Sequence, residues 1–229
     1  MLFGVAMGSA FRMTFAPPPL PEPGSDEDAQ LLAVIRRKAE ALPLVQELSA
    51  DPSWKSWDAY TTLPTDADAG ADAAARDLQR RQRLTSGAMG GARGLAFQRV
   101  FRHADTGECV SVVYFGGGTS GWPGVVHGGA LATVLDESLG RAAILHFPSR
   151  TGVTARLELT YRAPTRAEAF YVVRARPVED GEEKDGKKND RKLWVEGAVE
   201  DLDGKVNVQA KALFVVPRNI KLVPLGEGF

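Results

Sequence analysis

The sequence of 229 residues has little of what disulfides and metal centres are built from. Cys109 is the single cysteine, which excludes an internal disulfide and a cysteine-rich zinc site. There are three histidines, His103, His127 and His146, so a metal site would have to be assembled from these and from carboxylates. No metal is expected.

A surplus of charge and a long apolar run are missing as well. Lys and Arg number 28 against 29 for Asp and Glu, which gives a net charge of −1. Nucleic-acid-binding domains are usually basic, so a nucleic acid is not an expected partner. No segment reaches the roughly 20 apolar residues that cross a bilayer, so no membrane span is expected. The composition, 44% hydrophobic and 25% charged, is that of a globular domain.

The first segment, residues 1–24, is apolar or small as far as Phe11, and no acid precedes Glu22. It lacks a basic stretch ahead of the apolar part, which argues against a secretory signal. A mitochondrial presequence, a disordered N-terminus and a truncated anchor remain as interpretations, and the location is left open between cytoplasm and mitochondrion. Five prolines in residues 16–24 predict an extended linker.

Residues 25–92 are expected to form an N-terminal extension of helix and low-complexity chain. Ser25 is a good helix cap, acids follow it in the first turn, and Pro43 is expected to end the helix. Seven arginines lie between Arg76 and Arg102 with one acid among them. They form either a solvated helix face followed by a loop, or a positive rim for an anionic ligand.

From residue 93 the pattern predicts strands around one long apolar helix. The helix is expected over residues 128–147, where apolar side chains occur on most sides. Strands are expected at residues 95–102, 109–115, 153–162, 169–176, 193–199 and 206–216. An antiparallel sheet wrapped around the helix would bury it. The sequence therefore predicts an α+β domain over residues 93–217, followed by a tail, residues 218–229.

The segment with the clearest chemistry is residues 127–137. Gly128 and Gly129 stand where a loop becomes a helix, and the first N–H groups of a helix have no internal partner. Such donors suit a carbonyl oxygen that gains negative charge. Asp136 follows about two turns later, and Glu137 lies about 100° further round, so only one of the two acids should face that site. The alternatives are a tight turn and an Asp that reaches the surface.

This segment resembles the signature of hotdog-fold acyl-CoA thioesterases of the PaaI-like, or thioesterase-superfamily-member, type. In these, His-Gly-Gly is followed by an acid seven residues after the second glycine, as in His127, Gly128, Gly129 and Asp136 here. The resemblance implies that the Gly128 N–H polarises the thioester carbonyl, that Asp136 acts as general base or nucleophile, and that Thr154 positions water. His127 would be a structural or oxyanion-loop residue. The likeness extends to fungal relatives, although an Asn that some relatives carry before the histidine is absent.

The resemblance implies a hotdog fold and hydrolysis of acyl-CoA to a fatty acid and coenzyme A, without a metal or redox cofactor. It also implies a homodimer, or a dimer of dimers, with sites at the interface. Gly129 would contact substrate, and Arg162, Arg191 and Lys192 are candidates for the coenzyme A phosphates. Two rivals stay open, a hydratase and a non-catalytic acyl-CoA-binding protein. Hydratases of this fold usually place a His soon after the Asp, whereas here His146 follows ten residues later.

Two aromatic residues near this segment, Trp122 and Phe147, are expected in the core rather than along an acyl tunnel. Cys109 is expected to be a buried, inert thiol, because it lies within a predicted strand.

Overall fold

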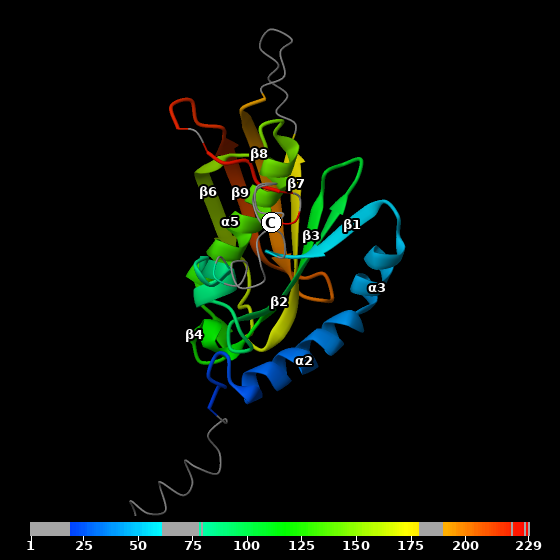
Figure 1. The fold of residues 1–229 in the computed structure, drawn as a ribbon, viewed down its shortest axis with the longest axis vertical. Coiled ribbons are helices and arrows are strands. Elements are labelled where there is room, and N and C mark those ends of the chain that lie inside the picture. The colour runs from blue at the N-terminus through cyan, green and yellow to red at the C-terminus, as the bar shows by residue number, and fades with distance from the viewer. Residues whose placement is uncertain are drawn as a thin grey trace, which may run out of the picture.

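The computed structural model describes residues 19–60, 78, 80–178, 190–220, 222–226 and 228 (Figure 1). Residues 1–18, for which a presequence was one interpretation, and most of the low-complexity part of the extension lie outside these residues. The helices are α2 (Asp26–Glu40), α3 (Pro43–Ala50) and α5 (Gly128–His146), with short helical turns η2 (Leu84–Ala88) and η3 (Gly117–Thr119). Within the described part of the chain, no helix is long and apolar enough to span a bilayer.

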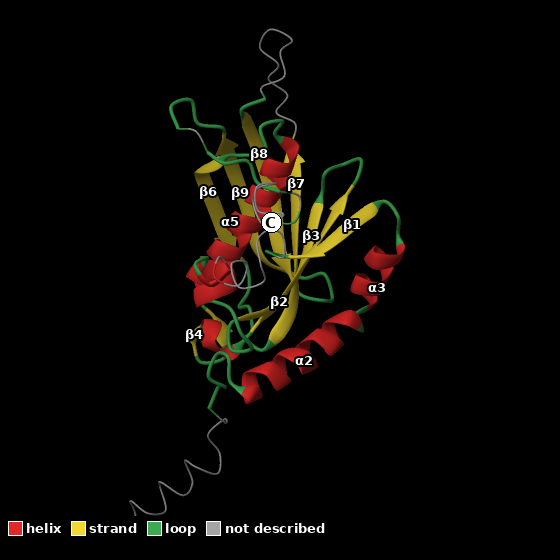
Figure 2. Cartoon of the chain, viewed as in Figure 1, coloured by secondary structure: helices red, strands yellow, loops and turns green. Residues whose placement is uncertain are grey.

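Seven strands form one antiparallel sheet in the order β1-β2-β3-β7-β8-β9-β6, and β4 and β5 form a separate hairpin. The strands are β1 (Trp54–Asp58), β2 (Leu95–His103), β3 (Cys109–Phe115), β4 (Ser120–Trp122), β5 (Val125–Val126), β6 (Val153–Tyr161), β7 (Ala169–Val178), β8 (Lys192–Glu200) and β9 (Val206–Val215). The sheet curves around α5, which packs on β7, β8 and β9 (Figures 1 and 2). The predicted α+β hotdog arrangement is confirmed.

The long helix α5 forms the centre of the main core. Leu135 and Leu139 are fully buried in it, together with Phe214 from β9. Gly140 lets the helix approach the sheet closely, since a Cβ there would lie 3.1 Å from the Phe214 ring. This packing fixes the position of α5 over the sheet, and therefore the position of every side chain that α5 carries.

The strand β3 is buried on both faces, as its nearly continuous apolar sequence suggests. Val113 and Phe115 belong to the core around α5, whereas Val110 and Val112 belong to a second core on the opposite face. That second core is completed by α2 and α3, which pack along the outer face of the sheet, away from α5 (Figure 1). The part of the extension that forms α2 and α3 is thus packed onto the sheet.

Two features of the extension differ from the sequence-based expectation. Pro43 does more than end α2, because it is the first residue of α3, a position where its missing N–H costs nothing. The strand β1 pairs with β2 and adds an edge to the sheet, so the sheet continues across the predicted boundary at residue 93. A five-residue strand without clear alternation gives no periodic signal that would have revealed it.

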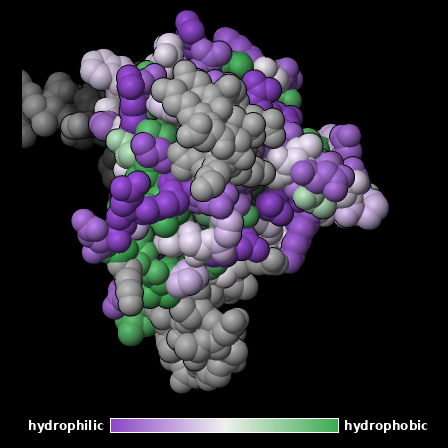
Figure 3. Space-filling view, turned by 90° about the horizontal axis from the view of Figure 1, so that it is seen from above, coloured by the Kyte–Doolittle hydropathy of each residue, from purple (hydrophilic) through white to green (hydrophobic). Residues whose placement is uncertain are grey.

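Among the coloured residues of the face seen in Figure 3, many are hydrophilic, and hydrophobic residues gather toward the lower left. Trp122 is 75% exposed at the β4–β5 hairpin, so the prediction that it lies in the core is wrong, because a tight hairpin tip has no layer above it. Phe147 and Cys109 are buried as expected, and burial raises the pKa of the Cys109 thiol to about 11.

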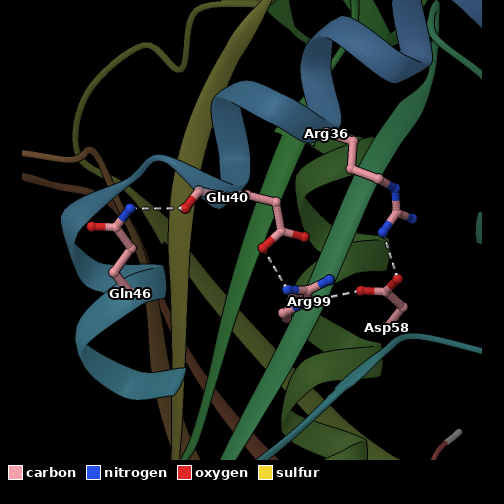
Figure 4. A network of polar contacts seen from close by, with 5 residues as sticks. All are labelled: Arg36, Glu40, Gln46, Asp58 and Arg99. Atoms are coloured by element: carbon pink, nitrogen blue, oxygen red, sulfur yellow. Dashed lines mark hydrogen bonds and ion pairs between the residues drawn. The ribbon is translucent and has the colours of Figure 1, made fainter. Parts of the chain in front are cut away.

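Charged side chains fasten α2 to the sheet (Figure 4). Arg99 of β2 donates hydrogen bonds to Glu40 of α2 and to Asp58 of β1, each at 2.9 Å. Arg36 of α2 donates to the other oxygen of Asp58, also at 2.9 Å. Partial burial alone would raise the pKa of Asp58, but the hydrogen bonds from Arg99 and Arg36 outweigh it and hold this pKa below its usual value.

We expect Asp58→Asn to lower the free energy of unfolding by about 1 kcal/mol at pH 7, a modest value because Arg36 is solvated. Because the pKa of Asp58 is lower in the folded than in the unfolded state, its carboxylate stabilises the fold at pH values above the unfolded pKa of about 3.9. This stabilisation is lost as the pH falls through the folded-state pKa. The difference between wild type and variant should therefore shrink below about pH 4. Urea unfolding at several pH values measures it, with Asp105→Asn as the exposed control. A difference independent of pH would contradict this account.

Candidate active site

The N-terminus of α5 presents one backbone donor without a partner. His127 is the N-cap, and its Nδ1 accepts a hydrogen bond from the Gly129 N–H at 2.8 Å. The His127 carbonyl accepts the next donor, the Ala130 N–H, at 2.9 Å. Among the described residues, the N–H of Gly128 makes no hydrogen bond. It lies at the positive end of the helix dipole, where an oxyanion is stabilised.

Nδ1 of His127 is a hydrogen-bond acceptor in this turn. The imidazole stabilises the turn through its hydrogen bond with the Gly129 N–H. The backbone N–H of His127 donates a hydrogen bond to the Thr119 carbonyl at 2.9 Å. This geometry gives His127 a place in the loop that shapes the helix terminus, next to the free donor.

The carboxylate of Asp136 is bound by a residue of the neighbouring edge strand. Thr154 of β6 donates its hydroxyl hydrogen to Asp136 Oδ1 at 2.8 Å. Strict alternation along β6 would turn Thr154 away from α5, since Leu157 and Leu159 pack toward the core around that helix. The pairing of β6 with β9 shifts between Thr154 and Arg156, and this bulge turns Thr154 toward α5.

The neighbouring acid, Glu137, faces another part of the molecule. Its Oε1 accepts a hydrogen bond from the buried Thr85 at 2.9 Å, and Tyr60 is hydrogen-bonded to it as well. Burial raises the pKa of Tyr60 to about 12. The two acids therefore face different parts of the molecule, as their separation of about 100° around the helix predicted. The contacts of Glu137 with the extension were not foreseen, because Thr85 lies 52 residues away and no local pattern connects the two.

The Gly128 N–H and the Asp136 carboxylate lie apart within one chain. They are eight positions apart on α5, which corresponds to about 12 Å along the helix. Tyr161, at the far end of β6, donates a hydrogen bond to the Gly128 carbonyl at 2.9 Å. One end of β6 is therefore next to Gly128, and the other end is next to Asp136.

The three basic candidates are spread over two places. Arg162 follows β6 at the Gly128 end and donates to Gln209 Oε1 at 2.9 and 3.1 Å. Arg191 and Lys192 lie at the Thr154 end, about 25 Å from Arg162 along the strand direction. Lys192 is exposed, whereas the Arg191 guanidinium donates to the Val216 carbonyl at 2.7 Å. Within a single chain these residues are not brought together.

Other arginines of the predicted basic stretch are engaged within the fold. Arg99 binds Asp58 and Glu40, and Arg83 lies over the Tyr60 ring at 5.0 Å from its centroid. In the part of the chain that the structure describes, no three His, Cys, Asp or Glu side chains are grouped to hold a metal ion.

An antiparallel sheet wrapped around one long helix is the hotdog fold. Residues 123–182 match the family model described as Thioesterase superfamily. This match, together with the fold, supports a thioester hydrolase.

The chain is also similar to individual proteins along its length. The acyl-coenzyme A thioesterase THEM4 of Mus musculus is 28% identical over 204 residues, covering 86% of this chain and 80% of THEM4. An uncharacterized protein of Schizosaccharomyces pombe is 34% identical over 118 residues, covering 49% of this chain and 63% of that protein. A solved thioesterase superfamily protein aligns with a TM-score of 0.48 and 23% identity, covering 86% of this chain and 94% of its own.

Proposed function

We propose that this protein hydrolyses acyl-CoA to a fatty acid and coenzyme A. The observation that carries the proposal is the pair of groups on α5, a free Gly128 N–H and an Asp136 carboxylate oriented by Thr154. A thioester hydrolase needs a donor for the developing oxyanion and a base for the water. The likeness to THEM4 supports a coenzyme A thioester as the substrate class.

In the proposed reaction, Asp136 takes a proton from water, and the resulting hydroxide adds to the thioester carbonyl carbon. The carbonyl oxygen becomes an oxyanion, held by the Gly128 N–H. The C–S bond then breaks, and the proton held by Asp136 passes to the thiolate of coenzyme A. The Thr154 hydroxyl donates a hydrogen bond to Asp136. The lone pairs of the Thr154 oxygen can therefore accept a hydrogen bond from the attacking water.

We propose that two copies of the chain complete each site. A single carbonyl cannot meet two groups that lie about 12 Å apart on one helix. The edge strand β6 has β9 on one side and no described strand on the other, and it exposes Val153 and Tyr161. Antiparallel pairing of two β6 edges about their middle would bring Gly128 of one chain to Asp136 of the partner subunit. It would also bring Arg162 toward Lys192 of the partner subunit, at either side of one coenzyme A.

The direct test is release of free coenzyme A from a series of acyl-CoAs. Turnover supports the hydrolase, and the product distinguishes it from a hydratase, which would leave the thioester intact. Binding of acyl-CoA without turnover would instead favour the non-catalytic binding protein.

Shared sites predict complementation between two inactive variants. We expect Asp136→Asn and Gly128→Pro to be nearly inactive alone, because each removes one group from both sites of its dimer. After unfolding and refolding together in equal amounts, mixed dimers should hold one intact site each, which restores about a quarter of wild-type activity. Recovery no greater than the sum of the separate variants would contradict the shared site, and sedimentation would show whether dimers had formed.

A further inference from the structure

A cavity of about 670 Å³ lies beside the N-terminal half of α5, between the hotdog domain and the extension. The extension contributes Leu84, Ala88 and Met89 to its lining, and the hotdog domain contributes Thr119, Ala130 and Thr133. Sites for small molecules usually enclose about 300–1,000 Å³, so this cavity has the size of a ligand site. No minimal hotdog domain would have this wall, because five of the cavity's fifteen lining residues belong to the extension.

The cavity is continuous with the candidate active site. His127 and Gly129, on either side of the free Gly128 N–H, belong to its lining. A molecule whose carbonyl is held at Gly128 can therefore extend directly into the cavity.

The lining is small and mostly uncharged. Among the described residues around the cavity, Arg93 is the one with a full charge, and its guanidinium lies 3.8 Å from the Glu22 carboxylate. The phosphates of coenzyme A would need several positive partners, and this lining does not offer them. A hydrocarbon chain needs only shape and apolar contact.

The wall made by the extension is held in place from both sides. Thr85, fully buried, donates to Glu137 of α5, and the Met89 side chain packs against the core around α5. The Gly118 N–H donates to the Arg93 carbonyl at 2.7 Å. Gly87 is confined as well, because a Cβ there would lie 2.1 Å from the Arg81 carbonyl oxygen. The cavity therefore has a preformed wall, and its depth is set by the side chains that stand on that wall.

We propose that this cavity receives the acyl chain of the substrate, and that Leu84 and Ala88 of the extension set the chain length that it accepts. The proposal rests on the acyl-CoA hydrolysis inferred above, and it adds the subsite and the residues that determine specificity.

Ala88→Trp fills the cavity from the extension side and tests the proposal. The measurement is kcat/KM over a series from short to long acyl-CoAs. Ala88→Trp should lower kcat/KM about tenfold or more for the longest chains, and less than about twofold for the shortest. Leu84→Ala, which enlarges the cavity, should move the preference toward longer chains. The controls are Ala33→Trp, on the exposed side of α2, and Leu202→Ala, whose leucine is 51% exposed against 55% for Leu84.

Three outcomes would overturn the proposal. An unchanged chain-length profile in both cavity variants would show that the acyl chain lies elsewhere. An equal loss for all chain lengths would place the pantetheine arm, which every substrate shares, in the cavity. A change of the same kind in Ala33→Trp would reveal a general effect on folding. Retained turnover of short substrates shows that Ala88→Trp is folded. If Ala88→Trp does not fold, the chain-length profile of Leu84→Ala tests the proposal instead.

Failure of the proposed function would be visible separately. If the wild type hydrolyses no acyl-CoA, calorimetric binding of a thioether analogue of a long acyl-CoA tests the cavity by itself. The subsite is supported, without catalysis, if Ala88→Trp binds the long analogue more weakly than wild type does and binds short analogues equally well. Equal binding by wild type and Ala88→Trp would overturn it.

Discussion

Asp136→Asn should lower kcat for acyl-CoA hydrolysis about 10²- to 10⁴-fold, the usual contribution of a general base. The amide is nearly the same size and can still accept the hydrogen bond from Thr154, so the fold and the binding of substrate should be retained. KM should therefore change far less than kcat. Steady-state kinetics with free coenzyme A as the readout measure both values.

The adjacent acid provides the matched control. Glu137→Gln makes the same chemical change one residue away, but Glu137 is bonded to Thr85 and not to the proposed reaction centre. Glu137→Gln should lower the melting temperature and leave kcat nearly unchanged. Equal losses of kcat in both variants would contradict the assignment of the base. A single turnover in ¹⁸O-labelled water adds a second check, because a base that activates water stays unlabelled, whereas a carboxylate that attacks the carbonyl carbon acquires the label.

Gly128→Pro is expected to lower kcat about 10²- to 10³-fold, because it removes the N–H that would hold the oxyanion. Proline is well tolerated as the first residue of a helix, where its φ suits the helix. The residue before it must be extended, and His127 already has φ −62° and ψ 134°. The backbone is thus suited to a substitution that deletes one donor and leaves α5 in place.

Gly128→Ala separates the loss of the donor from the addition of atoms. A Cβ at this position lies 3.2 Å from the Tyr161 hydroxyl oxygen, so both variants crowd the same neighbour. Alanine keeps the N–H and should retain most of the activity, whereas proline should not. If both variants lost activity equally, steric crowding would explain the result and the oxyanion role of the N–H would be wrong.

The sequence predicted those parts of the molecule that depend on local pattern. The helix predicted at residues 128–147 is observed at Gly128–His146, and the strand at residues 109–115 is observed as β3. Both have strong apolar patterns that tertiary contacts reinforce. The proximity of Asp136 and Thr154 was expected from a family resemblance, since nothing in the spacing of residues 18 positions apart indicates a contact.

Other features depend on contacts between distant segments and could not be predicted. Alternation along residues 153–161 places Thr154 on the wrong face, and only the bulge in β6 corrects it. The pairing of β1 with β2, and the bond between Thr85 and Glu137, join the extension to the domain over long stretches of chain. Sequence periodicity reports which face of an element is apolar, but not which distant segment covers it.

The helices on the outer face of the sheet restrict how copies of this protein can stack. Two sheets packed face to face lie about 10 Å apart, and α2 and α3 already fill that layer over β2 and β3. The rest of the outer face, over β7, β8 and β9, carries charges of both signs that pair with one another, such as Arg174 with Glu200 and Lys211 with Glu196. A second sheet therefore cannot pack directly against the half of this sheet that α2 and α3 cover.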